Sequence, residues 1–316
     1  MPALIRLFFA TDVHGSEVCW RKFISAAKFY DANLLILGGD MTGKAIVPII
    51  AQAEGKHKVT LLEQETILEG PDEVRKMVET IQNRGYYPYV TSPEEVRELS
   101  DSPGRSEALF LQESVKTVER WMAYADERLD GKGIRCYVCP GNDDMFEIDA
   151  AIAASKTVRS VEGQVVALDE HHEMASTGWS NPTPWQTHRE EPDEALGRRI
   201  EAVVGQLKNP ANAVFAFHVP PYGSGLDEAP ELTKDLRPAY AGRSLVPVGS
   251  KSVLRAIETH KPLLGLHGHI HEGKGARKFG RTLCLNPGSM YEQGVLHGAL
   301  VDLKESKLGN YVLTTG

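Results

Sequence analysis

Two short pairs of side chains in this sequence have the residue types and the spacing of metal ligands. Asp12 and His14 form an Asp-x-His pair, and His269 and His271 form a His-x-His pair within LHGHIHEG. In an extended chain, residues two apart lie on one face, with Cα atoms about 6 to 7 Å apart. Each pair can therefore direct two side chains into one pocket, where they hold one ion or two neighbouring ions. A His-x-His pair also occurs on ordinary half-exposed strands, so it does not establish a site alone.

Three further polar residues belong with these pairs. Asp40 follows the apolar run ANLLILGG, Asn142 lies in CPGND, and His218 follows AVFAF. Taken singly, Asp40 and Asn142 are typical of turns, and His218 is typical of a buried, hydrogen-bonded histidine. Together the seven side chains offer three carboxylate or amide oxygens and four imidazoles. That set exceeds the capacity of one four-coordinate zinc ion and suits two ions that share a bridging carboxylate.

The segments that must position these residues have the pattern of a covered, largely parallel sheet. Six apolar runs alternate with helix-like segments and cover residues 4–12, 32–40, 133–143, 213–221, 262–271 and 282–289. Continuous apolar strands are typical of a sheet covered on both faces. Five of the six runs end in, or lead directly into, one of the polar residues above. Because ligands of open α/β sheets bind beyond the carboxyl ends of the strands, we expect the seven side chains to meet at one edge.

Residues 44–132 depart from this alternation. KAIVPIIAQ and HKVTLLEQETILEG predict a β-hairpin or a small three-stranded flap with a Gly-containing turn. GPDEVRKMVETIQNRG predicts a helix with Pro near its start and Gly at its end, and SPEEVRELSDSPG predicts a short helix or loop. A longer amphipathic helix follows. We interpret residues 44–105 as an inserted flap of β-hairpin and helix within a single domain that spans residues 1–316.

Composition and charge restrict the class of protein. The 316-residue chain has 41% hydrophobic and 25% charged residues, as is typical of globular proteins, and a formal net charge of −8. The acidic balance argues against a nucleic-acid polymer as partner and leaves a small phosphorylated substrate open. Arg6 and Asp12 interrupt the N-terminal apolar run, which predicts a strand rather than a signal peptide. Since no apolar stretch has the length of a membrane span, we expect a cytoplasmic protein without a membrane partner. Its oligomeric state is left open.

The four cysteines do not form the framework of a disulfide-rich protein. Cys136 and Cys139 are spaced as Cys-x-x-Cys, but they lie on a predicted strand, where residues three apart face opposite sides. We therefore expect buried, reduced thiols.

Five motifs, considered as an ordered set, resemble those of the calcineurin-like metallophosphoesterase family. They are Asp-x-His at Asp12 and His14, Gly-Gly-Asp ending at Asp40, Gly-Asn ending at Asn142, His218 followed by two prolines, and Gly-His-x-His ending at His271. NPGS at residues 286–289 also resembles a tail motif of some bacterial and archaeal members. The resemblance implies an α/β fold, a four-layer α-β-β-α sandwich with the site at strand ends.

The resemblance also implies a role for each ligand and a reaction. Asp12, His14 and His271 would bind the first metal ion, Asn142, His218 and His269 the second, and Asp40 would bridge both. The two ions would be Mn²⁺, Zn²⁺, Ni²⁺ or iron as Fe²⁺ or Fe³⁺, with manganese expected. A hydroxide that bridges them would attack the phosphorus atom of a phosphoester. No G-x-S-x-G or P-loop motif indicates a different mechanism.

The sequence departs from the family pattern directly after Asn142. Many members carry there a His that helps to protonate the leaving oxygen, whereas this chain has Asp143 as its candidate catalytic residue. A carboxyl group can donate that proton only if burial or a neighbouring charge raises its pKa, and two nearby cations oppose the shift. A phosphodiester with a good leaving group needs the least acid assistance, so the sequence favours a phosphodiesterase.

Two alternatives remain open. The first is a phosphomonoesterase or nucleotide hydrolase that uses the same metal ions. The second belongs to a different class, a metal-stabilised scaffold for protein interactions without turnover. The presence of all seven ligand positions argues against the scaffold.

Overall fold

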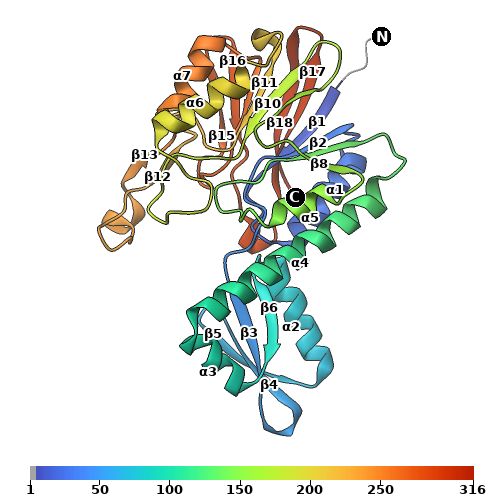
Figure 1. Cartoon of the computed structure of the whole chain (residues 1–316), viewed down its shortest axis with the longest axis vertical. Coiled ribbons are helices and arrows are strands. Elements are labelled where there is room, and N and C mark those ends of the chain that lie inside the picture. Colours follow the sequence, from blue (N-terminus) through green and yellow to red (C-terminus); the bar gives the residue numbers. More distant parts are fainter. Residues whose placement is uncertain (1–4) are drawn as a thin grey trace.

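Two six-stranded β-sheets face each other in the computed structural model, which describes residues 5–316 (Figure 1). The first sheet has the strand order β18 (Lys307–Thr315), β17 (His297–Lys304), β1 (Ile5–Ala10), β2 (Leu34–Leu37), β7 (Arg135–Val138) and β8 (Val158–Ser160). The second has the order β15 (Gly275–Phe279), β16 (Thr282–Asn286), β14 (Leu264–Leu266), β11 (Val214–Phe217), β10 (Glu173–Thr177) and β9 (Val165–Ala167). Four neighbouring strands of each sheet are parallel, and the remaining strands pair antiparallel at the edges.

Helices cover the outer face of each sheet. Against the first sheet pack α1 (Glu17–Phe29), α4 (Pro103–Leu129) and α5 (Ile148–Ala153). Against the second sheet pack α6 (Asp193–Val204) and α7 (Lys251–His260). A separate apolar core lies between the sheets. The fold is therefore the four-layer α-β-β-α sandwich that the sequence predicted.

The continuous apolar runs are explained by burial on both faces of each sheet. In β1, Leu7 and Phe9 join the core between the sheets, whereas Phe8 and Ala10 join the core beneath the helices. Because successive side chains of a strand point to opposite faces, the buried positions on both faces of such a strand are apolar. The exception in β1 is the half-buried Arg6, which pairs with Asp302 of β17. Residue 4, which the predicted strand 4–12 includes, lies outside the described residues.

A smaller lobe extends from the sandwich at the end where β2 leads into β3 (Figure 1). Its four-stranded sheet has the order β5 (Gln64–Glu69), β4 (Lys56–Leu61), β3 (Ile46–Ala51) and β6 (Tyr87–Thr91). The helices α2 (Pro71–Asn83) and α3 (Pro93–Asp101) and the start of α4 complete it. The sequence predicted at most three strands here, because the short β6 is defined by its parallel pairing with the distant β3 rather than by a local turn. The division into one domain with an insertion at 44–105 stays a prediction.

The remaining elements are short. β12 (Glu228–Pro230) and β13 (Leu245–Pro247) form a two-stranded sheet, and 3-10 turns occur at η1 (Ala53–Gly55), η2 (Pro210–Asn212), η3 (Ala239–Gly242) and η4 (Tyr291–Gln293). The β17–β18 hairpin, which the sequence analysis did not predict, extends the first sheet at its β1 edge.

The cysteines agree with the predicted buried, reduced thiols. All four cysteines are free and buried, and burial raises the pKa of the Cys136 thiol. Within residues 5–316, none of the helices is both long and apolar enough to cross a lipid bilayer.

Candidate metal centre

The carboxyl ends of five central strands bring the predicted ligands to one rim between the two sheets. Asp12 and His14 follow β1, Asp40 follows β2, Asn142 follows β7, His218 follows β11, and His269 and His271 follow β14. Five of these seven side chains are buried, and the two last are half-buried. The structure therefore unites residues that are up to 259 positions apart in the chain (271 minus 12).

The backbone at this rim is strained. Asp12, His14, Asp40 and His269 have positive φ angles of 52°, 38°, 50° and 67°. Residues other than glycine rarely adopt this left-handed conformation, which costs about 1 to 3 kcal/mol and persists where the surrounding structure enforces it. Strain at four of seven predicted ligands indicates that the fold holds these side chains in place for a function rather than for stability.

The first group of side chains consists of Asp12, His14 and His271, whose donor atoms lie within 4.8 Å of one another. The Nε2 atoms of His14 and His271 are 3.0 Å apart. Asp12 Oδ1 lies 3.6 Å from Nε2 of His271 and 4.0 Å from Nε2 of His14. Two imidazole nitrogens and a carboxylate oxygen thus face a common point.

The second group consists of Asp40, His218 and His269, again within 4.8 Å of one another. Asp40 Oδ2 lies 3.4 Å from His218 Nε2, and the same oxygen lies 3.6 Å from Nε2 of His14 in the first group. The side-chain oxygen of Asn142 is 3.1 Å from His218 Nε2. Asp40 therefore contacts both groups, and Asn142 adds a neutral oxygen to the second.

Hydrogen bonds orient the donor atoms toward these points. His218 Nδ1 lies 2.7 Å from the carbonyl oxygen of Gly38, so a proton on Nδ1 leaves the Nε2 lone pair free. The amide nitrogen of Asn142 donates to Thr187 Oγ1 at 2.8 Å, which turns its oxygen toward His218. Partners of this kind are typical of metal-binding residues. The sequence analysis did not identify Thr187, which belongs to no motif.

The electrostatics of the cluster fit a pair of divalent cations. Burial lowers the pKa of His14 to about 3 and that of His269 to about 4, which keeps both imidazoles neutral, the form that binds metals. Burial would raise the pKa of Asp12, but the hydrogen bond with His271 and the charge of His218 outweigh it and hold the pKa at about 2. The carboxylates of Asp40 and Asp12 outweigh burial and raise the pKa of His218 to about 10 and that of His271 as well, so these two imidazoles must release a proton when a cation binds. Imidazole nitrogens and carboxylate oxygens are donors that first-row divalent metals bind.

Asp143 and Lys44 lie beside this cluster. The Lys44 ammonium forms an ion pair with the Asp143 carboxylate. Asp143 Oδ2 lies 3.8 Å from Nδ1 of His14, and the backbone N–H of Asp143 donates to Asp40 Oδ1 at 3.0 Å. Burial and the charge of Asp40 raise the pKa of Asp143 to about 6, and Lys44 opposes that shift. The sequence analysis identified Asp143 but not Lys44, which carries no motif of its own.

The NPGS segment connects the loops that carry the ligands. Asn286 Nδ2 lies within 3.2 Å of the carbonyl oxygens of Leu226, Gly268 and Ile270, and Asn286 Oδ1 accepts from Gly288 N at 2.8 Å. Ser289 Oγ donates to the carbonyl oxygen of Asp12 at 2.6 Å. These bonds fix both the loop that follows β14 and the turn that follows β1.

Replacing Asn286 with Ala should therefore weaken metal binding as well as the fold. The carbonyl oxygen of Leu226 and the backbone N–H of Gly288 lose this hydrogen-bond partner, whereas the carbonyls of Gly268 and Ile270 still accept from Ile270 N and Gly273 N. Each unpaired buried group costs about 1 to 3 kcal/mol. We expect a fall in the free energy of unfolding of about 3 kcal/mol, measured by urea titration, and a metal affinity about 10- to 100-fold lower, measured by calorimetry. Wild-type affinity in a folded Asn286→Ala variant would show that these bonds do not hold the ligands.

His267 differs from the two histidines that follow it. It is fully buried, its Nδ1 lies 2.8 Å from the carbonyl oxygen of Phe217, and it belongs to neither ligand group. Because it lies two residues before His269, it packs behind the rim, in the core of the second sheet.

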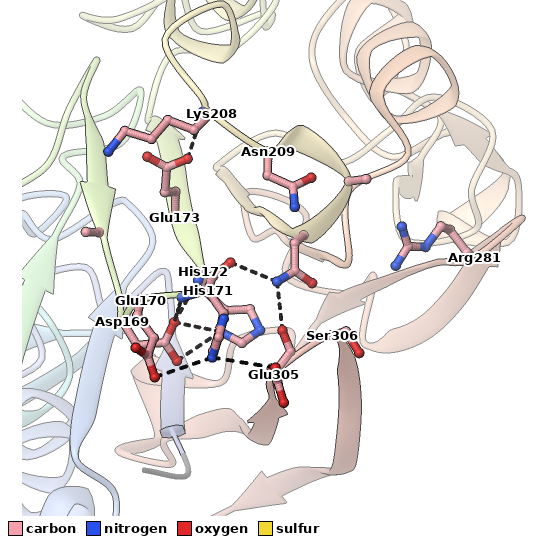
Figure 2. Close-up of a pocket in the computed structure, with 13 residues that line it drawn as sticks. Asp169, Glu170, His171, His172, Glu173, Lys208, Asn209, Arg281, Glu305 and Ser306 are labelled. Atoms are coloured by element: carbon pink, nitrogen blue, oxygen red, sulfur yellow. Dashed lines mark hydrogen bonds and ion pairs between the residues drawn. The ribbon is translucent and has the colours of Figure 1, made fainter. Parts of the chain in front are cut away.

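A separate cavity of about 610 Å³ lies at the other end of the second sheet (Figure 2). Most of its lining residues precede or begin β10, β11 and β16, and Glu305 and Ser306 come from the turn between β17 and β18 of the first sheet. The predicted ligands, in contrast, follow the carboxyl ends of their strands. Polar groups in it contact one another, as Asp169 Oδ1 and His172 Nδ1 do at 2.9 Å. None of the seven predicted ligands lines this cavity.

Comparison with known protein sequences gives a match over part of the chain. No protein-family model matches the sequence. An uncharacterized protein of Methanocaldococcus jannaschii, MJ1162, is 31% identical over 150 residues, which are 47% of this chain and 61% of that protein. The chain thus spans less than two thirds of this relative's length.

Solved structures match over almost the whole chain. TT1561 of Thermus thermophilus is 17% identical, with 99% of both chains covered and a TM-score of 0.54. YfcE, a phosphoesterase from E. coli, is 11% identical, with 98% of both chains covered and a TM-score of 0.35. The match to TT1561 shows that this chain shares the fold of that structure, and two groups of His and Asp side chains lie at its strand ends.

Proposed function

We propose that this protein is a metal-dependent phosphoesterase that hydrolyses a small phosphodiester. The observation that supports this most strongly is the position of Asp40, whose carboxylate faces histidines of both ligand groups. One oxygen-bearing side chain shared by two N/O clusters is the arrangement that a binuclear hydrolytic centre needs.

The ligand sets follow from the two groups. Asp12, His14 and His271 would hold one ion, Asn142, His218 and His269 the other, and Asp40 both. When bound, such a pair of divalent cations lowers the pKa of a water molecule and neutralises charge on the phosphoryl oxygens. Transition metals compete for such sites by availability as well as by ligand type, and we propose Mn²⁺ as the ion to test first.

The chain's own residues have three tasks in this reaction. The ionised Asp12 and Asp40 and the imidazoles in their neutral form would provide the binding atoms, and His218 and His271 would release a proton as the ions bind. Gly38, Thr187 and the NPGS segment keep those atoms in position. Asp143, whose side chain is 15% exposed, faces the open side of the cluster and is the proposed catalytic residue beside the leaving group.

The preference for a diester follows from the identity of Asp143. Burial and Asp40 raise its pKa to about 6, but Lys44 opposes that shift and two bound cations would lower the pKa further, so Asp143 is a carboxylate at neutral pH and a poor donor of a proton to a leaving alkoxide. A diester with an acidic leaving group does not need that proton. We also propose a cytoplasmic location, which the four free thiols support.

A comparison of two chromogenic substrates tests the proposal. With Mn²⁺ present, we expect kcat/KM for bis(p-nitrophenyl) phosphate to exceed that for p-nitrophenyl phosphate by about tenfold or more, which corresponds to about 1.4 kcal/mol of transition-state stabilisation. The reverse order would favour the phosphomonoesterase. No hydrolysis of either ester with Mn²⁺, Zn²⁺, Ni²⁺ or Fe²⁺ would favour an interaction scaffold.

A further inference from the structure

Lys44 places a positive charge beside a cluster built to hold cations. It is the fourth residue after Asp40 and leads directly into β3 of the lobe. Its ammonium pairs with Asp143, whose carboxylate is 3.8 Å from His14 Nδ1. An ion pair that served only stability would be better placed away from two divalent ions, because like charges repel. A lysine at this position suits a site whose bound ligand is an anion.

The backbone beneath Lys44 is fixed from two sides. The buried carboxylate of Asp144 accepts from the backbone N–H of Met41 at 2.9 Å and of Thr42 at 2.8 Å. On the lobe side, Gly43 N donates to the hydroxyl of Tyr87 at 2.7 Å. A side chain on Gly43 would clash with the carbonyl oxygen of Gly85, so the two backbones are in direct contact. Lys44 therefore projects from a rigid support, which lowers the entropic cost of using it to bind a ligand.

The two members of the Lys44–Asp143 ion pair differ in their exposure to solvent. The Lys44 side chain is 44% exposed, whereas that of Asp143 is 15% exposed and those of Asp12 and Asp40 are 0% and 4% exposed. Lys44 is thus more exposed than any of these carboxylates and than His271, whose side chain is 30% exposed, and Asp143 contacts both Lys44 and His14. A phosphoryl group that enters from solvent meets the ammonium before or as it reaches the cluster.

We propose that Lys44 is a substrate-binding residue, which donates hydrogen bonds to a non-bridging oxygen of the substrate's phosphoryl group, and that Asp143 positions it. This inference rests on the proposed function and assigns the phosphate contact of the same site to the lobe. A lysine binds phosphate as a point charge with three N–H donors, and such charge-assisted bonds are about twice as strong as neutral ones. The contact exists in the bound substrate as well as in the transition state, so it acts mainly on KM.

The test compares Lys44→Ala and Lys44→Arg with Lys56→Ala. Lys56 is a matched control, because it lies on β4 of the same lobe, is 41% exposed and pairs with Glu69 at 3.0 Å. For each Mn²⁺-loaded protein, calorimetry gives the Kd of inorganic phosphate, steady-state kinetics give KM and kcat for bis(p-nitrophenyl) phosphate, and elemental analysis gives the metal content. We expect Lys44→Ala to raise both Kd and KM about tenfold with kcat changed less than about threefold. Lys44→Arg should recover part of the loss, and Lys56→Ala should match the wild type.

The outcomes separate this inference from the proposed function. Unchanged phosphate Kd and KM in metal-loaded Lys44→Ala would overturn the role of Lys44, and so would a loss of metal ions from that variant, because Lys44 would then support the ions rather than the substrate. If the wild type hydrolyses neither ester, the proposed function fails. The phosphate Kd of the same proteins still decides whether Lys44 binds a phosphoryl group.

Discussion

Replacing Asp40 with Asn is expected to abolish turnover, with kcat lower by about a thousandfold or more, because the metal pair contributes several kcal/mol to stabilising the transition state. Asn has nearly the same shape as Asp, and its oxygen can still accept the bond from Asp143 N at 3.0 Å. What it removes is the negative charge that lies 3.4 Å from His218 and 3.6 Å from His14. Without that charge, neither ligand group has its shared anionic donor.

The measurement is hydrolysis of bis(p-nitrophenyl) phosphate with Mn²⁺, together with the metal content of the variant. Asp302→Asn provides the control, because Asp302 is a partly buried carboxylate that pairs with Arg6 at 2.9 Å on β17 and β1 and does not contact the cluster. It should retain wild-type kcat. A rate for Asp40→Asn close to that of the wild type would show that Asp40 is not a shared ligand, and the assignment of two ions to this rim would have to be abandoned.

Removal of metal ions is expected to stop hydrolysis completely and to lower the melting temperature. Asp12 and Asp40 are buried, and in the absence of cations their charges are compensated by neighbouring imidazoles, by Lys44 and by the backbone N–H groups of His269 and Asp143. An ion present at a hundred times its Kd stabilises the folded state by about 2.7 kcal/mol. For a chain of this size, we therefore expect Mn²⁺ to raise Tm by about 5 °C or more.

The experiment is dialysis against EDTA, followed by assay and thermal unfolding before and after Mn²⁺ is added back. A parallel dialysis without EDTA controls for losses in handling. Both activity and Tm should return with Mn²⁺ in the wild type, and Asp40→Asn should show a smaller gain in Tm because it has lost the shared ligand. Persistent hydrolysis by protein that elemental analysis shows to be free of metal would rule out metal-dependent catalysis.

Much of the sandwich was predictable because its signals are local. β2 is apolar at every position, and β1 is apolar except for Arg6, since both faces of these strands are buried. The polar residues that follow them are recognisable against that background. The parallel arrangement then placed those residues at one rim without any knowledge of the contacts between them. The lobe was less predictable. Its strand β6 is five residues long and contains Pro88, and only its pairing with β3, about forty residues earlier, makes it a strand.

Residue type and position at a strand end sufficed to predict the seven candidate metal ligands, because both can be read along the chain. Their arrangement in two groups could not be predicted in this way, since the distances that make Asp40 common to both groups arise from the packing of two sheets. The contacts around the site also depend on the tertiary structure. The pairing of Lys44 with Asp143 and the bonds of Asn286 to three carbonyls depend on contacts between segments far apart in the chain, which no local pattern encodes.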